Sequence, residues 1–453
     1  MITSLGGVEY FERQCLAFLK NPQTNPQNEQ CIPGVFSYQE NKISFSFVVL
    51  GEIKEIYSLY ANPQYQTLYI VDNTKRYTLY KLYDCIVLGH TLGHPAPITL
   101  YYEWLFDDHI DPETIKGERF VCRTNYLESF FTTEKHLLPD ALFKVDESGC
   151  ESYHEDNDKD FILQSFYIQN DFLSQRYEKD KIKARFNSLV SPKQNRLLTY
   201  QFDLSLECNM IFETLEKLAL IVEAIKNFFI LIYAHSNFDI QIDYISFKLS
   251  NKDITAIKNT YKKDKKSMEI DPYGIAIQFK QIDHFSVMLE EWIDFYIKDN
   301  RGFQLQSILD IINKKDPIIH LYLDMFVLIS MIESFKKSQE TKLCKKLSEF
   351  FKTSLSRTKC DQTKNYFNDN YQKDLIKRIV DYRNNLAHGD DLKLDTNKAT
   401  DISHVFMDFK QIVIEYFFGK IGLSDFITNN FGFLNKVKLR NPPKTEKIAE
   451  PNR

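Results

Sequence analysis

The stretch Arg383-Asn384-Asn385-Leu386-Ala387-His388-Gly389 ends an amphipathic segment that runs from Lys373 to Ala387. Apolar residues recur there at helical spacing, with Arg383 on the same stripe, which predicts a helix over 373–387. A charged guanidinium on an apolar stripe is costly without acceptors, so we expect this stripe to face a partner helix or a site. Helical geometry puts Asn384 and His388 on one face and separates Arg383 from His388 by about 140°. One helix therefore cannot easily aim both cationic groups at one phosphate, whereas two copies can.

Helical periodicity continues through the C-terminal part of the chain. Six segments show it: 285–297, 303–312, 318–335, 342–351, 373–387 and 402–417. We expect an all-α helical bundle over 301–435, with a boundary at 299–302 before it and a mobile tail over 436–453 after it. Residues 301–440 carry 23 Lys and Arg against 17 Asp and Glu, although the whole chain has a net charge of -5. A basic C-terminal part is compatible with a polyanionic partner.

The first 300 residues show the alternation that is typical of β-strands. The pattern predicts hairpins over 34–50 and 67–85 and further strands at 98–104, 119–123, within 161–206, at 239–248 and at 274–279. A short helix is expected at 126–131, and a long amphipathic helix after Met210. We therefore expect an α+β protein. Residues 1–300 form its β-rich region of sandwich or barrel-like sheets with one long helix, and 1–207 and 208–300 are its subregions.

Cysteine, histidine and hydropathy patterns argue against several other classes of protein. The eight cysteines are scattered without a Cys-x2-Cys pair, which disfavours a disulfide framework and a zinc site. His90 and His94 are four residues apart, but the glycines and Pro95 beside them disfavour a helix, so we expect no metal and no cofactor. No apolar run is long enough to span a membrane and no export signal is recognisable, so we expect a cytoplasmic protein without membrane contact.

The stretch 383–389 resembles the signature of the HEPN superfamily, which comprises all-helical ribonucleases and nucleotide-binding modules. That signature is an Arg, usually followed by a polar residue, and then a His near a helix end. Arg383, Asn384 and His388 match it, with four residues between the Arg and the His. The motif lies between two apolar segments, of which the upstream one contains Glu333.

The order of the two parts of the chain resembles ApeA-type anti-phage defence proteins, in which a β-rich region precedes a HEPN domain. In the N-terminal part the likeness is general and lies at 33–38 and 126–131. The resemblance implies a role in abortive infection, a phage-derived trigger, and a sensing or regulatory task for residues 1–300. RNA is then the expected substrate, with tRNA as one candidate.

The HEPN resemblance implies a metal-independent endoribonuclease, in which the RNA 2'-hydroxyl attacks the adjacent phosphate. Arg383 is expected to hold phosphate oxygens, and His388 to act as a general acid or base. Asn384 is expected to orient the imidazole or to bind a phosphate oxygen, and Glu333 to pair with Arg383 or with another basic residue. The same resemblance implies a composite site in a homodimer formed through the HEPN domain, or in a higher even-numbered oligomer.

Two interpretations without catalysis stay open. In the first, Arg383 is a structural residue satisfied by Glu333 or Asp381, and His388 only interacts with the dipole at the end of its helix. In the second, the domain is a non-catalytic HEPN module that dimerises or binds nucleotides or RNA as a scaffold.

Overall fold

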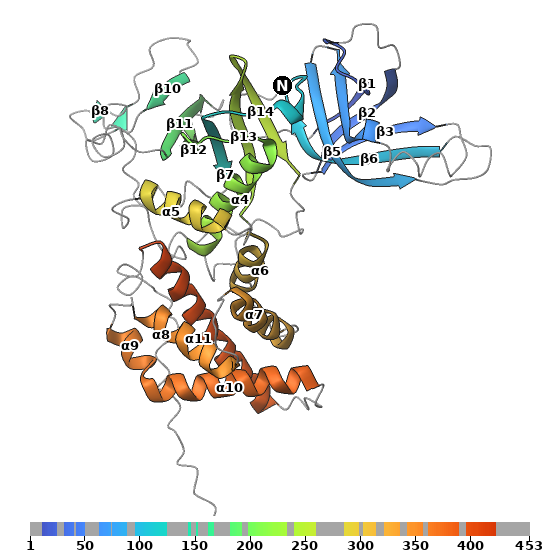
Figure 1. Cartoon of the computed structure of the whole chain (residues 1–453). Helices are drawn as coiled ribbons and strands as arrows, with labels where there is room; N and C mark the ends of the chain where they lie inside the picture. The colour runs from blue at the N-terminus through green and yellow to red at the C-terminus, as the bar shows by residue number, and fades with distance from the viewer. Residues whose placement is uncertain are drawn as a thin grey trace, which may run out of the picture. The chain divides into compact units, whose positions relative to one another are not determined.

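The computed structural model describes most of the chain, in two compact units. The described residues are 11–24, 31–39, 42–49, 63–73, 75–87, 96–124, 144–145, 151–152, 162–166, 182–192, 198–232, 240–259, 285–298, 302–313, 321–335, 342–356, 361–388 and 396–422. The first unit comprises 1–128, 134–222 and 240–269, and the second 129–133, 223–239 and 270–453. Strands prevail in the first and helices in the second (Figure 1), which confirms the expected α+β class.

Six antiparallel strands of the first unit close a barrel. They are β1 (Phe11–Phe18), β2 (Cys31–Gln39), β3 (Lys42–Val49), β4 (Thr67–Asp72), β5 (Lys75–Val87) and β6 (Ala96–Phe106). Their order is β6-β3-β2-β1-β4-β5, and pairing of β5 with β6 closes the ring. The expected hairpins are confirmed as β2–β3 and β4–β5. Closure leaves no free edge strand in this barrel.

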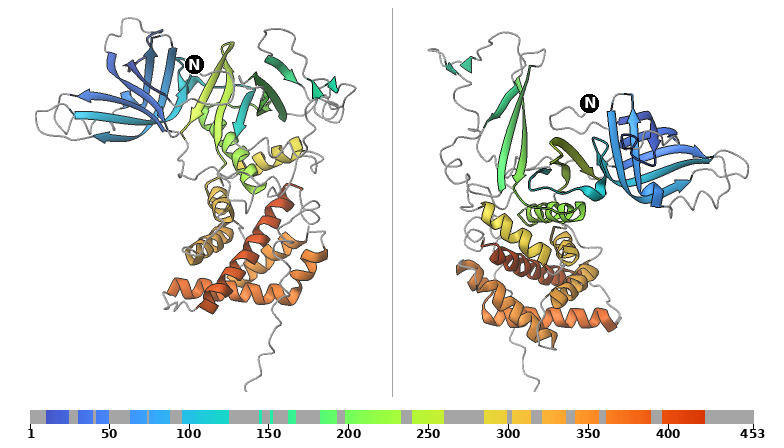
Figure 2. Two further views of the ribbon diagram at one scale, coloured as in Figure 1. Left: turned by 180° about the vertical axis from the view of Figure 1, so that it is seen from behind. Right: turned by 45° about the horizontal axis from the view of Figure 1, so that its top comes forward.

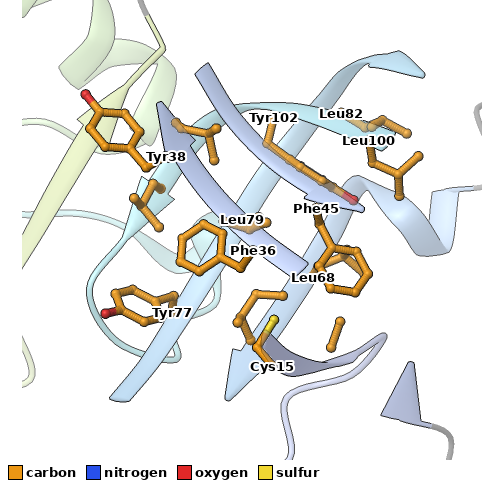
Figure 3. Packing of buried hydrophobic residues seen from close by; sticks show 14 of the residues in the cluster. Cys15, Phe36, Tyr38, Phe45, Leu68, Tyr77, Leu79, Leu82, Leu100 and Tyr102 are labelled. Carbon is orange, nitrogen blue, oxygen red and sulfur yellow. The ribbon is translucent and has the colours of Figure 1, made fainter. Parts of the chain in front are cut away.

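Alternate residues of these strands fill the barrel interior (Figure 3). The buried cluster consists of Cys15, Ala17, Phe36, Tyr38, Ile43, Phe45, Phe47, Leu68, Ile70, Tyr77, Leu79, Leu82, Ile98, Leu100, Tyr102, Leu105 and Ile257. The hydroxyl of Tyr102 donates to the carbonyl oxygen of Tyr65 at 2.9 Å, so this buried polar group is satisfied. Gly34 has no room for a side chain, because a Cβ there would lie 2.5 Å from the ring of Phe45.

The same sheet continues beyond the barrel from the end of β6, through six more strands. Their order is β10-β11-β12-β7-β13-β14, and β14 pairs with Trp104–Phe106 of β6 beyond the reach of β3. The strands are β7 (Phe120–Thr124), β10 (Ile162–Phe166), β11 (Ile182–Pro192), β12 (Leu198–Cys208), β13 (Ile242–Leu249) and β14 (Lys252–Lys258). A separate pair joins β8 (Lys144–Val145) and β9 (Glu151–Ser152). The segments 126–131 and 274–279 lie outside the described residues, and β14 was not expected from the sequence.

The second unit is helical. Its described helices are the end of α4 (Leu215–Ile232), α5 (Phe285–Ile297), α6 (Gly302–Asn313), α7 (Leu321–Phe335), α8 (Leu343–Leu355), α9 (Asp361–Tyr366), α10 (Asp369–His388) and α11 (Thr396–Lys420). The dark red α11 runs through its middle (Figures 1 and 2) and is buried over most of its length from Val405 onward. The predicted helices correspond to α4–α8, α10 and α11, whereas α9 was not predicted.

The helical unit begins before the expected boundary at 299–302. Trp292 of α5 packs 6.1 Å from the ring of Phe417 and 6.4 Å from that of Phe228, and its Nε1 donates to the carbonyl oxygen of Ala224 at 2.8 Å. Helix α5 and the end of α4 therefore share a core with α11. The expected range 301–435 therefore leaves out two elements of this core, α5 and the end of α4.

Candidate functional site

Helix α10 carries Arg383, Asn384 and His388, and it begins earlier than expected because its first turn is capped. Asn368 caps it: its Oδ1 accepts from the backbone N–H of Tyr371 at 3.1 Å, and its carbonyl oxygen from that of Gln372 at 2.9 Å. This cap lets the helix begin at Asp369, one turn before the predicted start. The helix ends at His388, so six residues of the stretch 383–389 are helical.

The apolar stripe of α10 is covered at its beginning and becomes exposed toward its end. Ile376 is 4% exposed, Val380 and Arg383 are half-buried, and Ala387 is exposed. The first turns of this stripe are therefore covered by other parts of the protein, and the expectation that the stripe faces a partner helix or a site stays a prediction for its last turns. Its last two turns, which carry Arg383 and Asn384, are left partly uncovered by the described part of the chain.

One hydrogen-bond donor of Arg383 has no partner in the described ranges. Its Nη1 donates to Oδ1 of the neighbouring Asn384 at 3.4 Å, a long contact, and its Nε is buried without a hydrogen-bond partner among the described residues. An ionised guanidinium has five donors in one plane and binds oxyanions through two of them at once. The half-buried guanidinium therefore keeps donor capacity that the described residues do not use, although the enclosed Nε itself is not open to a ligand.

Asn384 and His388 follow Arg383 on the last two turns of α10. Asn384 is half-buried, and its Oδ1 accepts from the Arg383 guanidinium. His388 is the last residue of the helix, and the placement of its imidazole lies outside the described part of the chain. At about 100° per residue, the backbone directions keep Asn384 and His388 on one face and Arg383 well apart from His388.

Glu333 of α7 pairs with a different basic residue from Arg383. Its Oε1 accepts from Nζ of Lys346 on α8 at 3.1 Å, and both side chains are partly exposed. Within the described residues, Arg383 makes no ion pair with Glu333 or with Asp381. Of the two partners expected for Glu333, the structure therefore shows a nearby lysine, and Glu333 is not brought together with the α10 residues.

Sequence reasoning missed a polar contact between α10 and α11. Asp401 of α11 accepts hydrogen bonds from the Arg378 guanidinium and the Tyr382 hydroxyl, and forms an ion pair with Arg378. The usable signal was the spacing of Arg378 and Tyr382, which puts both on one face of α10.

A second carboxylate of α11 lies further along the same contact. Asp408 accepts from the hydroxyl of Tyr371, and from that of Tyr366 at 3.1 Å. Burial raises the pKa of Asp408 above its usual range, although both tyrosine hydrogen bonds act in the opposite direction. Burial, together with the Asp408 charge, raises the pKa of Tyr366 to about 12.

The remaining predicted sites give no further constellation. His90 and His94 lie outside the described residues. Across the described ranges, no three His, Cys, Asp or Glu side chains gather so that they could hold a metal ion. None of the described helices is long and apolar enough to cross a membrane. Comparison with protein-family models, curated proteins and solved structures found no match for this chain.

Proposed function

We propose that the helical unit is a HEPN-type, metal-independent endoribonuclease that acts in anti-phage defence. The observation that carries the proposal is the half-buried Arg383, whose Nε has no hydrogen-bond partner among the described residues. A structural arginine on a helix normally donates hydrogen bonds to neighbouring carboxylates or carbonyls. An arginine with a donor that the described residues leave unpaired, five residues before a helix-ending histidine, is suited to bind an anion.

The reaction needs no external reagent. The 2'-hydroxyl oxygen forms a bond to the adjacent phosphorus while the bond from phosphorus to the 5'-oxygen breaks. One base takes the proton of the 2'-hydroxyl and one acid returns a proton to the leaving 5'-oxygen, which leaves a 2',3'-cyclic phosphate and a 5'-hydroxyl. His388 supplies proton transfer near neutral pH, and Arg383 stabilises charge on the phosphorane oxygens. Asn384 orients the imidazole or binds a phosphate oxygen.

Two copies of α10 complete the site in this proposal. Arg383 and His388 diverge by about 140° on one helix, so one copy offers either group to a phosphate more readily than both. The partly uncovered end of the α10 stripe is available for a second subunit. The active form is therefore a homodimer, or a higher even-numbered oligomer, that joins two sets of Arg383, Asn384 and His388 in one cleft.

In the cell, such a ribonuclease has to be held inactive until it is needed. A ribonuclease is harmful to a healthy cell, so the β-rich first unit is the candidate regulator, which responds to a phage-derived trigger in the cytoplasm. RNA is the substrate, with tRNA as one candidate. This part rests on the order of the two units and on the resemblance to ApeA-type proteins.

The test compares the wild-type protein with Arg383→Ala, Arg383→Lys and His388→Ala. Lys377→Ala is the matched control, because Lys377 is an exposed cation on the same helix. We expect growth inhibition, and RNA fragments with cyclic phosphate ends, from the wild type and the control. EDTA should not suppress the RNA cleavage. All three site variants should lose both growth inhibition and cleavage, the Lys variant included because an ammonium lacks the planar fork. Equal behaviour of all five proteins, with dimerisation intact, would instead indicate a non-catalytic scaffold.

A further inference from the structure

Side-chain hydrogen bonds join α10 and α11 at two levels along their lengths. From α10, Tyr371, Arg378 and Tyr382 contribute, at spacings of seven and eleven residues, which places them within about 40° of one another around the helix axis. From α11, Asp401 and Asp408 are seven residues apart and therefore also share a face. The earlier aspartate binds the later α10 residues and the later aspartate binds the earlier one, so the two helices run antiparallel.

These hydrogen bonds restrain two movements of α10: sliding along α11 and rotation about its own axis. Two carboxylates about 10 Å apart along α11 each hold a different turn of α10, so α10 cannot slide along α11 without breaking both sets of hydrogen bonds. Because these hydrogen bonds lie on one stripe of α10, a rotation of the helix about its axis would break them as well; the helix also packs against α7 and α8. Arg378 is enclosed, with 21% of its side chain exposed, and a second carboxylate, Asp374 of the same helix, lies 3.7 Å from its Nη1.

Among the described residues, the Asp401 hydrogen bonds are the last ones between α10 and α11 before the candidate site. Tyr382 immediately precedes Arg383, and its hydroxyl is held by Asp401. Beyond Tyr382 the helix is only loosely covered: Arg383 and Asn384 are half-buried, and Asn385 and Ala387 are exposed. The direction in which the last turns of α10 point therefore depends on where Tyr382 is fixed, since each following residue is placed about 100° further around the axis.

We propose that Asp401 is a positioning residue: by holding Arg378 and Tyr382, it sets the rotation and register of α10 that aim Arg383 and Asn384 into the site. The effect of Asp401 on RNA cleavage rests on the proposed function. Its effect on the order of the last turns of α10 can be measured without catalysis. Asp401 touches no substrate in this scheme, and it acts only through the two α10 side chains.

The test uses the full chain with Asp401→Asn, Tyr382→Phe and Asp374→Asn. Asp401→Asn removes the charge and keeps the size, and Tyr382→Phe removes one hydroxyl only. Asp374→Asn is the matched control, because it takes a carboxylate from the same guanidinium but leaves α10 attached to α11. Hydrogen exchange of the 383–388 amides, exchange of the 375–379 amides, and kcat and KM for RNA cleavage are measured for each protein.

We expect Asp401→Asn and Tyr382→Phe to exchange the 383–388 amides at least about tenfold faster, with 375–379 unchanged. The kcat should fall about tenfold to a hundredfold and KM should stay within about twofold, because aim is lost while substrate binding is retained. Asp374→Asn should match the wild type in each measurement. Unchanged 383–388 exchange in both test variants, or equal acceleration at 375–379, overturns the positioning role. If the wild type cleaves no RNA, the proposed function fails while the exchange experiment still decides whether Asp401 orders the end of α10.

Discussion

Glu333 of α7 holds Lys346 of α8 at 3.1 Å and makes no contact with Arg383 among the described residues. The acidic residue that the sequence offered as a partner for the site arginine is thus engaged elsewhere. Among the described residues, the buried Nε of Arg383 has no acceptor, and Asp401 and Asp408 of α11 accept hydrogen bonds from other side chains of α10.

Replacing Glu333 by Gln should lower the stability of the protein slightly and leave its RNA cleavage unchanged. The pair with Lys346 is partly exposed, so the free energy of unfolding should fall by at most about 1 kcal/mol. Urea denaturation of Glu333→Gln, Lys346→Met and the double variant measures the coupling between the two side chains. RNA cleavage per folded molecule should stay within about twofold of the wild type. A loss of cleavage at unchanged stability would return Glu333 to the site.

Replacing Arg383 by Met should cost little stability. Within the described part of the chain the guanidinium makes one long hydrogen bond and its buried Nε has no partner, so its removal should change the free energy of unfolding by no more than about 0.5 kcal/mol in either direction. Thermal and urea unfolding provide the measurement, and cleavage assays of the same samples should show the activity gone. Destabilisation by several kcal/mol would mean that Arg383 is a structural residue with acceptors of its own.

Replacing Gly34 by Ala should destabilise the barrel. The new methyl group would lie 2.5 Å from the Phe45 ring and closer still to the backbone oxygen of Ser46, and backbone cannot move aside in a closed sheet. Overpacking of this kind costs about 1–3 kcal/mol. Circular dichroism during urea unfolding measures the loss. Ser37→Ala, on the same strand, is the control, and equal stability of both variants would contradict the close packing at Gly34.

Asp408 should give stability an unusual dependence on pH. Its pKa in the folded protein is raised, so between its usual pKa and the raised one the folded state binds more protons than the unfolded state. In that window stability contributed by Asp408 is present at the acidic end and is lost as the pH rises. Asp408→Asn cannot ionise, so its stability relative to the wild type should increase with pH there. Urea unfolding at several pH values tests this, and a difference that decreases with rising pH would contradict the raised pKa.

The sequence by itself determined the local elements. Two-residue alternation predicted the hairpins β2–β3 and β4–β5, because strand pairing through a short turn is a local property. Helical periodicity predicted α5 and α10, because amphipathic spacing extends over several turns. The six-residue α9 is too short for a periodic signal, and β14 was missed because it begins and ends in charged residues.

Only the tertiary structure decided which elements meet. The closure of the barrel pairs β5 with β6 and β1 with β4, and the sharing of one core by α5 and α11 joins residues more than a hundred positions apart. The partners of Glu333 and Asp401 were decided in the same way. Local periodicity tells which face of an element is apolar, whereas the neighbour of that face depends on side-chain packing between distant segments, and that information is spread over the whole chain.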